Sequence, residues 1–424
     1  MIRVIEALNY RCLQYVHQTL DDFRILIGPN ASGKTTFLDV VGFLGDLLSE
    51  GLDSAITNRS TDLHDLFFMG KGNRFELAVE LEVPADRTKM LPTKREFPFV
   101  RYEVAVGLSP ESDEYHILDE QVVLTRFQSE GPARSKTRDL FPNPTPPPKT
   151  IMHPRQVGRD KHRAVRKVYE GNDNFYSEKG KGAGSKWAPS IRLGPRKSAL
   201  ANMPADEEQF PISTWLRETL INGTQRLMLN SLALRQSSRP GQGRVFKPDG
   251  SNLPWVIESL RSRAPERFGL WIEQLQTALP DIQDIRTVEL PDTKHRFLQI
   301  IYPGGLKVPS WTASDGTLRM LALTLPAYLP DFEGIYLIEE PENGIHPMAM
   351  ETVYQALKAV YRAQILLATH SPVILGCATA GEILCFKKDD TGATDVVTGA
   401  CHPALRQWQD SLNLSDLYAS GVLG

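Results

Sequence analysis

The stretch from Gly28 to Thr36, GPNASGKTT, fits the pattern G-x-x-x-x-G-K-[ST] of a phosphate-binding loop. The preceding run, DDFRILI, has the β-branched and aromatic residues of a buried strand. From Lys34 to Leu48 apolar residues recur at helical spacing, and Gly51 stands where a glycine ends a helix. This order of strand, loop and helix is what the motif requires, so the sequence predicts a nucleotide site in an α/β fold.

The alternative to a nucleotide site is a chance glycine turn. At an average glycine usage of about 7%, the pattern arises by chance in roughly a percent of chains of this length, before its context is considered. In such a loop, backbone amides wrap the α- and β-phosphates, the lysine reaches the β- and γ-phosphates and the following hydroxyl coordinates Mg²⁺. We therefore predict ATP and Mg²⁺ as cofactors, with contacts from Gly28, Asn30, Gly33, Lys34, Thr35 and Thr36.

A second motif, LIEEPENGIHP, places Glu339 and Glu340 side by side after the apolar run GIYLI. Open α/β sheets bind ligands at the carboxyl ends of their strands, and Mg²⁺ takes one or two carboxylates besides phosphate oxygens. We predict that Glu339 faces the metal and that Glu340 polarises the attacking water. A solvated acidic turn would explain the two glutamates equally well if the phosphate loop were absent.

The sequence THSP follows the apolar run QILLA, so His370 should lie at the same edge of the sheet as Glu339. At that edge it can contact the γ-phosphate. A lone histidine is more often structural, but its position after a predicted parallel strand favours a functional role. Pro372 then begins the next predicted helix.

A fourth motif, SDGTLR, opens the apolar helix LRMLALTLPAYL. Ser314 and Gly316 at a helix start can form an anion site from free amide groups. An ordinary N-cap by Ser314 is the alternative.

The four motifs in this order resemble the ABC-type ATPase heads of the SMC, RecF and OLD group. SDGTLR resembles their LSGGQ element, with Asp315 in place of the first glycine, and EPENGIHP resembles OLD and related AAA-type members more than the EPTSALD of membrane transporters. The stretches KPDGSNLPWVIESL and LxLSDLYxSGVLG are similar to those of stand-alone SMC-like AAA-type ATPases of bacteria.

This resemblance implies a head-to-tail homodimer with ATP sandwiched between two chains. Lys34, Glu339 and Glu340 of one chain would face Ser314 and Gly316 of the other.

Further residues gain a role from the resemblance alone. Asn9-Tyr10-Arg11 resembles the N-F-R element, which would bring Arg11 to the nucleotide, and Asn343 and His346 would lie in the D-loop. Glu339 departs from the group, where aspartate is usual.

OLD-type relatives carry a Toprim nuclease after the head, but the stretch after His370 is shorter than the roughly 100 residues of a typical domain. The resemblance therefore implies that any nuclease would be a separate effector.

The formal net charge of −3 is unevenly distributed. From Arg126 to Leu200 the chain has seventeen Lys and Arg against six Asp and Glu, a local charge of +11, and the remainder carries −14. This basic, Pro- and Gly-rich segment also contains His153, His162, Tyr169, Phe175 and Trp187. It could neutralise phosphates and stack on bases, giving contact with DNA or RNA; a solvated loop is the alternative.

The predicted organisation has four parts. Residues 1–125 give the first part of an ATPase lobe, with the phosphate loop and a β meander with one solvent-facing side (FELAVELEV, VRYEVAVGL and YHILDEQVVLTRF); 126–205 give the basic insertion of mobile loops; 206–330 give a helical lobe that ends in the SDGTLR helix; and 331–424 complete the ATPase lobe. The alternation of strand and helix in this last part predicts a parallel sheet.

No apolar run approaches the roughly 18 to 20 residues of a membrane span, and the start lacks a signal-peptide core, so we expect a cytoplasmic protein without membrane contact. The four cysteines form no CxxC pair, which makes a disulfide frame or zinc site unexpected.

Three functions remain open at this stage. The first is an ATP-driven dimerising switch on or near DNA that controls a separate effector, such as a Toprim-like nuclease, in phage defence or DNA repair. The second is an ATP-binding scaffold with slow turnover that holds a partner protein without binding DNA. The third is a transporter's nucleotide-binding subunit, which the EPENGIHP form and the long insertion disfavour.

Overall fold

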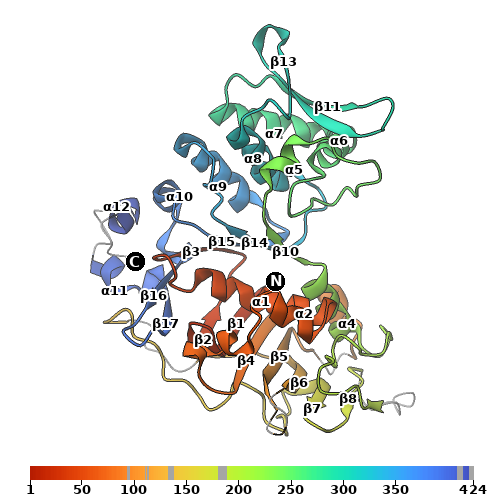
Figure 1. The fold of residues 1–424 in the computed structure, drawn as a ribbon, viewed down its shortest axis with the longest axis vertical. Coiled ribbons are helices and arrows are strands. Elements are labelled where there is room, and N and C mark those ends of the chain that lie inside the picture. Colours follow the sequence, from red (N-terminus) through yellow and green to blue (C-terminus); the bar gives the residue numbers. More distant parts are fainter. Residues whose placement is uncertain are drawn as a thin grey trace.

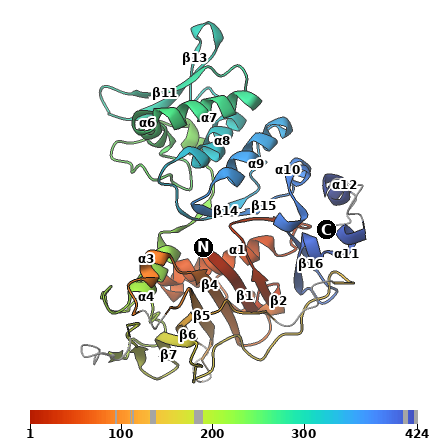
Figure 2. The same cartoon turned by 180° about the vertical axis from the view of Figure 1, so that it is seen from behind.

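A computed structural model describes residues 1–92, 96–109, 111, 114–131, 138–179, 189–407 and 414–419. The chain forms an upper lobe and a lower lobe, with a parallel sheet between them (Figures 1 and 2). Trp187 and the final residues of the SGVLG stretch lie outside the described residues.

The parallel sheet has six strands in the order β10-β14-β15-β3-β16-β17, and only β17 runs antiparallel to its neighbour. Its strands are β3 (Phe23–Ile27), β10 (Thr224–Leu227), β14 (Gly334–Glu339), β15 (Ala363–Ala368), β16 (Ile383–Lys388) and β17 (Thr394–Thr398). The predicted parallel sheet is therefore present, and the strand before the phosphate loop lies at its centre. All six residues of β15 are buried, which is why the four residues from Ile365 to Ala368 are all apolar.

Alternate residues of the parallel sheet face two different cores. Leu26 packs with the lower core, together with helix α1 (Lys34–Ser49), whereas Ile25 and Ile27 pack with the upper core. This alternation is the two-residue period of a strand that is buried on both faces. Helix α1 ends as predicted, because Gly51 has φ 91° and donates its N–H to the carbonyl oxygen of Asp46 at 3.1 Å.

The lower lobe is built on an eight-stranded sheet in the order β2-β1-β4-β5-β6-β7-β8-β9, whose observed pairs are antiparallel. The strands are β1 (Ile2–Tyr10), β2 (Leu13–Thr19), β4 (Arg74–Glu82), β5 (Phe99–Leu108), β6 (Tyr115–Thr125), β7 (Lys161–Val168), β8 (Asp173–Phe175) and β9 (Ser190–Ile191). The predicted meander is β4, β5 and β6. Residues 128–211, predicted as loops, in fact contribute β7, β8 and β9, and long basic side chains in KHRAVRKV had hidden the alternation of β7.

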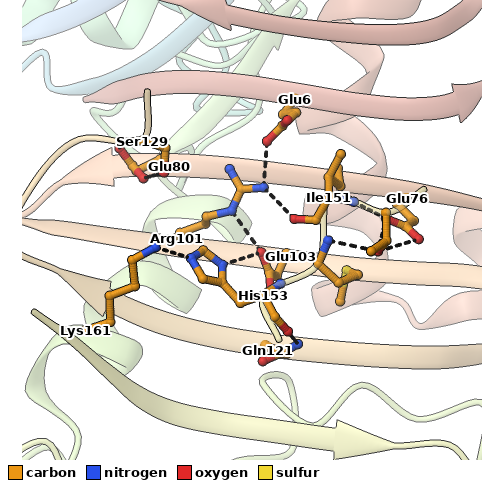
Figure 3. A network of polar contacts seen from close by, with 12 residues as sticks. Glu6, Glu76, Glu80, Arg101, Glu103, Gln121, Ser129, Ile151, His153 and Lys161 are labelled. Carbon is orange, nitrogen blue, oxygen red and sulfur yellow. Dashed lines mark hydrogen bonds and ion pairs between the residues drawn. The ribbon is translucent and has the colours of Figure 1, made fainter. Parts of the chain in front are cut away.

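The solvent-facing side predicted for the meander is wrong. Glu76, Glu80, Arg101, Glu103 and Gln121 on that side are at most 2% exposed. Residues 127–131 and 138–153, which we name the strap, cover them and satisfy their hydrogen bonds (Figure 3). The strap comes from a later part of the chain, so local alternation could not reveal this cover.

The lower lobe has three further helices: α2 (Leu52–Thr57), α3 (Ala85–Thr88) and α4 (Pro211–Ile221). The sequence predicts helix throughout ISTWLRETLINGTQRLMLNSLALRQ, but the structure divides this stretch into α4, β10 and α5 (Ser231–Arg235). The division follows from Gly223, whose carbonyl oxygen accepts the N–H of Ile335 at 2.7 Å and so brings the next residues alongside β14.

The upper lobe contains α5, a three-stranded sheet and several further helices. These elements are α6 (Leu253–Arg263), α7 (Pro265–Ala278), β11 (Asp284–Glu289), β12 (Arg296–Ile301), β13 (Lys307–Pro309), α8 (Asp315–Thr324) and α9 (Met350–Ala359). Pro265 occupies the first turn of α7, and Phe268, Ile272 and Leu275 share its buried face.

The last helices, α10 (Pro372–Cys377), α11 (Pro403–Gln407) and α12 (Leu414–Ala419), lie at one end of the parallel sheet (Figure 1). Among the described residues, no helix combines the length and apolar character needed to cross a membrane.

Candidate nucleotide-binding site

The phosphate loop connects the carboxyl end of β3 to the first turn of α1, as the motif requires. Gly33 has φ 108°, and a Cβ at this position would lie 2.6 Å from Oγ1 of Thr394 on β17. Any side chain would therefore strain the backbone and displace the adjacent strand. The glycine keeps the loop tight against the sheet, so that the backbone amides at the start of α1 can face an anion.

Lys34 extends across the phosphate loop. Its Nζ donates to the carbonyl oxygens of Gly28 at 2.7 Å and Pro29 at 3.0 Å. An ammonium has three donors, so a third remains for a phosphate oxygen. Burial lowers the pKa of Lys34 to about 8, against the opposing pull of Glu340, Glu339 and Glu342. Lys34 is thus a cation that is partly removed from water, which strengthens its attraction for a phosphate.

Glu339 ends β14 and lies next to the phosphate loop, as predicted. The Thr35 hydroxyl donates to Oε2 of Glu339 at 2.5 Å, and Nη2 of Arg226 donates to Oε1 at 2.5 Å. A hydroxyl beside a carboxylate at the start of the α1 helix is the oxygen donor set that Mg²⁺ prefers when phosphates supply further ligands. The residues present therefore fit the predicted metal, which Thr35 and Glu339 would hold.

Glu340 has φ 48°, a left-handed conformation that costs a non-glycine residue about 1–2 kcal/mol. Its N–H donates to the carbonyl oxygen of Ala368 on the neighbouring strand at 2.8 Å, and Nδ2 of Asn343 donates to its Oε2 at 2.7 Å. These contacts hold the strained turn that separates the two neighbouring carboxylates. The carboxylate oxygens of Glu339 accept hydrogen bonds from Thr35 and Arg226, whereas Glu340 is exposed at the pocket.

His370 follows β15 and is fixed by Glu342, the third glutamate of the EEPEN stretch. Oε1 of Glu342 accepts the N–H of His370 at 2.6 Å, and its Oε2 accepts the Thr369 hydroxyl at 2.8 Å. On the imidazole ring, Nδ1 lies 2.8 Å from the hydroxyl of Tyr418. Burial and then the charge of Lys34 lower the pKa of His370, although Glu342 and Glu340 act in the opposite direction. The ring is therefore mainly neutral at pH 7.

Arg11 reaches the same pocket from the turn between β1 and β2. Its Nη1 lies 3.7 Å from Oδ2 of Asp39 on α1, and its Nη2 donates to the carbonyl oxygen of Arg59 at 3.3 Å. The Tyr10 hydroxyl also donates to Asp39, at 2.6 Å. Asp39 thus joins the N-Y-R element to the helix that follows the phosphate loop.

One pocket of about 740 Å³ brings these residues together. Its volume is within the range of about 300–1,000 Å³ that is usual for small-molecule sites. Most of the predicted nucleotide, metal and catalytic residues line it: Arg11, Asn30, Gly33, Lys34, Thr35, Thr36, Glu339, Glu340 and His370. Gly28 contributes the carbonyl oxygen that holds Lys34.

Ser314 and Gly316 are not among the residues that line this pocket. Ser314 is the N-cap of α8 in the upper lobe, where its hydroxyl oxygen accepts the N–H of Thr317 at 3.1 Å. Gly316 lies against the turn after β14, since a Cβ on it would be 2.5 Å from the carbonyl oxygen of Gly344. Ser314 therefore acts as the N-cap of α8. Within one chain, the SDGTLR motif lies outside the pocket that the phosphate loop lines.

Sequence reasoning missed three residues around the pocket. Arg226 lies in a stretch predicted to be helical, so nothing suggested that it would reach Glu339. Glu342 was visible in the EEPEN motif, but its contact with the THSP loop depends on the pairing of β14 with β15. Tyr418 lies in the LxLSDLYxSGVLG stretch, and nothing in the sequence indicated that it would contact His370.

The basic segment is partly used inside the fold. Arg138 pairs with Asp395 at 2.5 Å, and Lys167 pairs with Asp173 at 2.9 Å. Nδ1 of His153 lies 3.0 Å from Glu103, and Nε2 of His162 lies 3.0 Å from the carbonyl oxygen of Ser177. Other basic side chains are exposed: Lys149, Arg155, Arg159, Lys161, Arg192 and Lys197.

The fold is similar to that of an SMC head domain, and the site combines a phosphate loop with the carboxylates at the end of a neighbouring strand. A family model described as "AAA domain, putative AbiEii toxin, Type IV TA system" matches residues 23–376. Because this range is most of the chain, the protein belongs to this family of AAA domains. No curated protein matches the chain.

One solved structure supports the fold. The Smc head domain with an extended coiled coil from Pyrococcus furiosus, bound to the C-terminal domain of ScpA, has a TM-score of 0.50 and 12% identity, over 96% of this chain and 98% of that chain. The SMC head domain from Thermotoga maritima has a TM-score of 0.45 and 11% identity, over 94% of this chain and 98% of that chain. At this identity the first likeness shows the fold alone.

Proposed function

We propose that the protein binds ATP with Mg²⁺, hydrolyses it, and uses the cycle as a switch. The observation that carries this proposal is the convergence of Lys34, Thr35, Glu339, Glu340 and His370 on one pocket. Phosphoryl transfer depends mainly on positioning and on electrostatic stabilisation of charge, and these side chains supply both.

Each side chain has a role that its contacts support. Lys34 would bind the β- and γ-phosphates with the donor that it has free. Thr35 and Glu339 would hold Mg²⁺, which neutralises charge that develops on the phosphate oxygens. Glu340, held by Asn343, would accept a proton from the attacking water, and His370 would donate a hydrogen bond to the γ-phosphate.

We infer that ATP closes a head-to-tail homodimer, in which Ser314 and Gly316 of one chain face the phosphate loop of the other. Ser314 is exposed at the start of α8, which offers amide groups to an anion. Large apolar side chains are exposed on the adjoining segments: Leu232 is 70% exposed, Trp311 50% and Met348 83%. Exposed apolar groups around a helix start are typical of a surface that becomes covered by a partner.

The test measures ATP hydrolysis together with the molecular mass of the protein in solution. Wild-type protein with ATP and Mg²⁺ should release phosphate, and light scattering should show a dimer with ATP that reverts when ATP is consumed. Lys34→Ala should lose ATP binding by calorimetry, with at least a hundredfold lower affinity, and should stay monomeric. ATP binding by Lys34→Ala that equals the wild type would contradict the assignment of the pocket.

We further propose that the switch acts on or near DNA and controls a separate effector, such as a Toprim-like nuclease, in cytoplasmic phage defence or DNA repair. The type IV toxin–antitoxin description of the family supports defence. The exposed basic residues of the segment 126–205 support contact with DNA phosphates.

This second proposal has its own experiment. Lys149, Arg155 and Arg159 are exposed, and replacing all three with Glu should lower DNA affinity. The slope of log affinity against log salt concentration should become shallower by up to about 3, one for each lost phosphate contact. Wild-type protein that binds no DNA at low salt would instead favour an ATP-binding scaffold that holds a partner protein.

A further inference from the structure

The C-terminal helix α12 lies beside the nucleotide pocket. It packs against α10, the helix that begins directly after the THSP motif (Figure 1). Leu414 and Tyr418 of α12 are partly buried against the upper core. A segment at the far end of the sequence therefore contacts the loop that carries His370.

Tyr418 is the residue through which α12 reaches the site. Its hydroxyl lies 2.8 Å from Nδ1 of His370 and 3.5 Å from the carbonyl oxygen of Gly28, the first residue of the phosphate loop. One tyrosine thus stands between the two motifs that contact the nucleotide in the proposed function. Burial, and then the charge of Glu342, raise the pKa of Tyr418, so its hydroxyl keeps its proton.

The single proton of this hydroxyl has two acceptors available. A distance of 2.8 Å is ideal for an O–H donor, whereas 3.5 Å is at the outer limit of a hydrogen bond. Donation to Nδ1 of His370 is therefore the favoured arrangement.

That donation decides which nitrogen of His370 carries a proton. Lys34, Glu340, Glu342 and Tyr418 are the titratable groups that face the ring, and burial with Lys34 lowers its pKa. A neutral imidazole has one N–H, and when Nδ1 accepts a hydrogen bond the proton must reside on Nε2. Among the described residues, Nε2 makes no hydrogen bond to the protein, so this N–H remains available to a ligand in the pocket.

We propose that Tyr418 is a positioning residue of the ATPase site: its hydroxyl donates to Nδ1 of His370 and fixes the Nε2–H form that can donate to the γ-phosphate. The C-terminal helix thereby becomes a part of the nucleotide site. This inference rests on the proposed function, in which His370 contacts the γ-phosphate.

Tyr418→Phe tests the inference, because it removes the hydroxyl and keeps the ring that packs against α10. We expect kcat to fall about tenfold, the effect of one lost hydrogen bond in the transition state, with little change in KM or in melting temperature. Tyr328→Phe is the matched control. Tyr328 is also partly buried and its hydroxyl donates to Gln274 at 2.9 Å, but it lies in the upper lobe outside the pocket lining, so kcat should not change.

A second measurement does not depend on hydrolysis. Nitrogen-15 NMR of the imidazole rings distinguishes the two neutral forms, and the His370→Gln spectrum identifies the signal of His370 among the nine histidines. Wild type should show a proton on Nε2, and Tyr418→Phe should show a mixture of both forms.

The outcomes separate the inference from the proposed function. An active wild type, with Tyr418→Phe equal to it in kcat and in the ring spectrum, overturns the role of Tyr418 alone. A wild type that hydrolyses no ATP overturns the proposed function, and the ring spectrum then still decides whether Tyr418 fixes His370.

Discussion

Two groups of carboxylates in this protein differ in how their charge is balanced. On the covered face of the large sheet, Glu76, Glu80 and Glu103 are at most 1% exposed, and each accepts hydrogen bonds from the strap (Figure 3). At the edge of the parallel sheet, Glu339 is partly exposed and Glu340 is exposed, and both line a pocket that also contains Lys34.

The comparison shows when clustered carboxylates indicate a structural role and when they indicate a ligand site. Burial opposes the charge of Glu103, yet hydrogen bonding to His153 and the charge of Arg101 hold its pKa below the usual range. The buried carboxylates therefore have their hydrogen-bond partners within the fold. The pocket group has oxygens that a metal and a water molecule can reach.

The largest predicted effect concerns the buried group. Arg101 donates to Glu6 at 2.7 Å and to Glu103 at 2.9 Å, and replacing it with Met would leave both carboxylates buried without their cation. We expect Arg101→Met to lower the free energy of unfolding by about 3–5 kcal/mol in urea denaturation.

Arg3→Met is the control for this loss. Arg3 pairs with Asp22 at 2.8 Å, and Asp22 is 56% exposed, so its removal should cost less than about 1 kcal/mol. If Arg101→Met costs no more than Arg3→Met, the buried group is not held by its partners.

The second prediction concerns the pH dependence of the pocket group. The pKa of Lys34 is about 8 in the free protein, and a bound phosphate favours its charged form. ATP affinity should therefore be nearly constant below pH 7 and fall about tenfold between pH 7 and 9, as measured by calorimetry. Lys34→Arg keeps its charge across this range, so any affinity that it retains should not vary with pH. A wild-type affinity that is equally flat would contradict the role of Lys34.

The smallest effect should come from Arg226. Its pair with Glu339 is partly exposed, with 44% of the Arg226 side chain accessible, so Arg226→Met should change stability by less than about 1 kcal/mol. If Glu339 binds Mg²⁺ as proposed, Arg226 competes with the metal for this carboxylate, and Arg226→Met should lower the Mg²⁺ concentration for half-maximal ATP binding about threefold. A higher Mg²⁺ requirement would instead indicate that Arg226 contacts the nucleotide.

The pocket was largely predictable from sequence because its motifs are local. Each follows an apolar strand, and the carboxyl ends of parallel strands meet at one edge, so Lys34, Glu339 and His370 could be placed together before the structure was known. The strands predicted at GIYLI and QILLA are confirmed as β14 and β15, with small shifts at their ends.

The remaining features depend on contacts between distant parts of the chain. The period-two pattern of the meander could not show that the strap covers its polar face. Strand β10 is only four residues long and follows a helical pattern, and it is fixed by pairing with β14. Tyr418 meets His370 only after α12 packs on α10.

The central claim is that the two neighbouring glutamates have separate roles: Glu339 binds the metal, and Glu340 accepts a proton from the attacking water. Single-turnover hydrolysis by Glu340→Gln, measured beside ATP binding and light scattering, tests it most directly. We predict that ATP affinity stays within about twofold of wild type, that hydrolysis falls at least about a hundredfold, and that the ATP-bound dimer persists. Undiminished hydrolysis by Glu340→Gln would contradict the account.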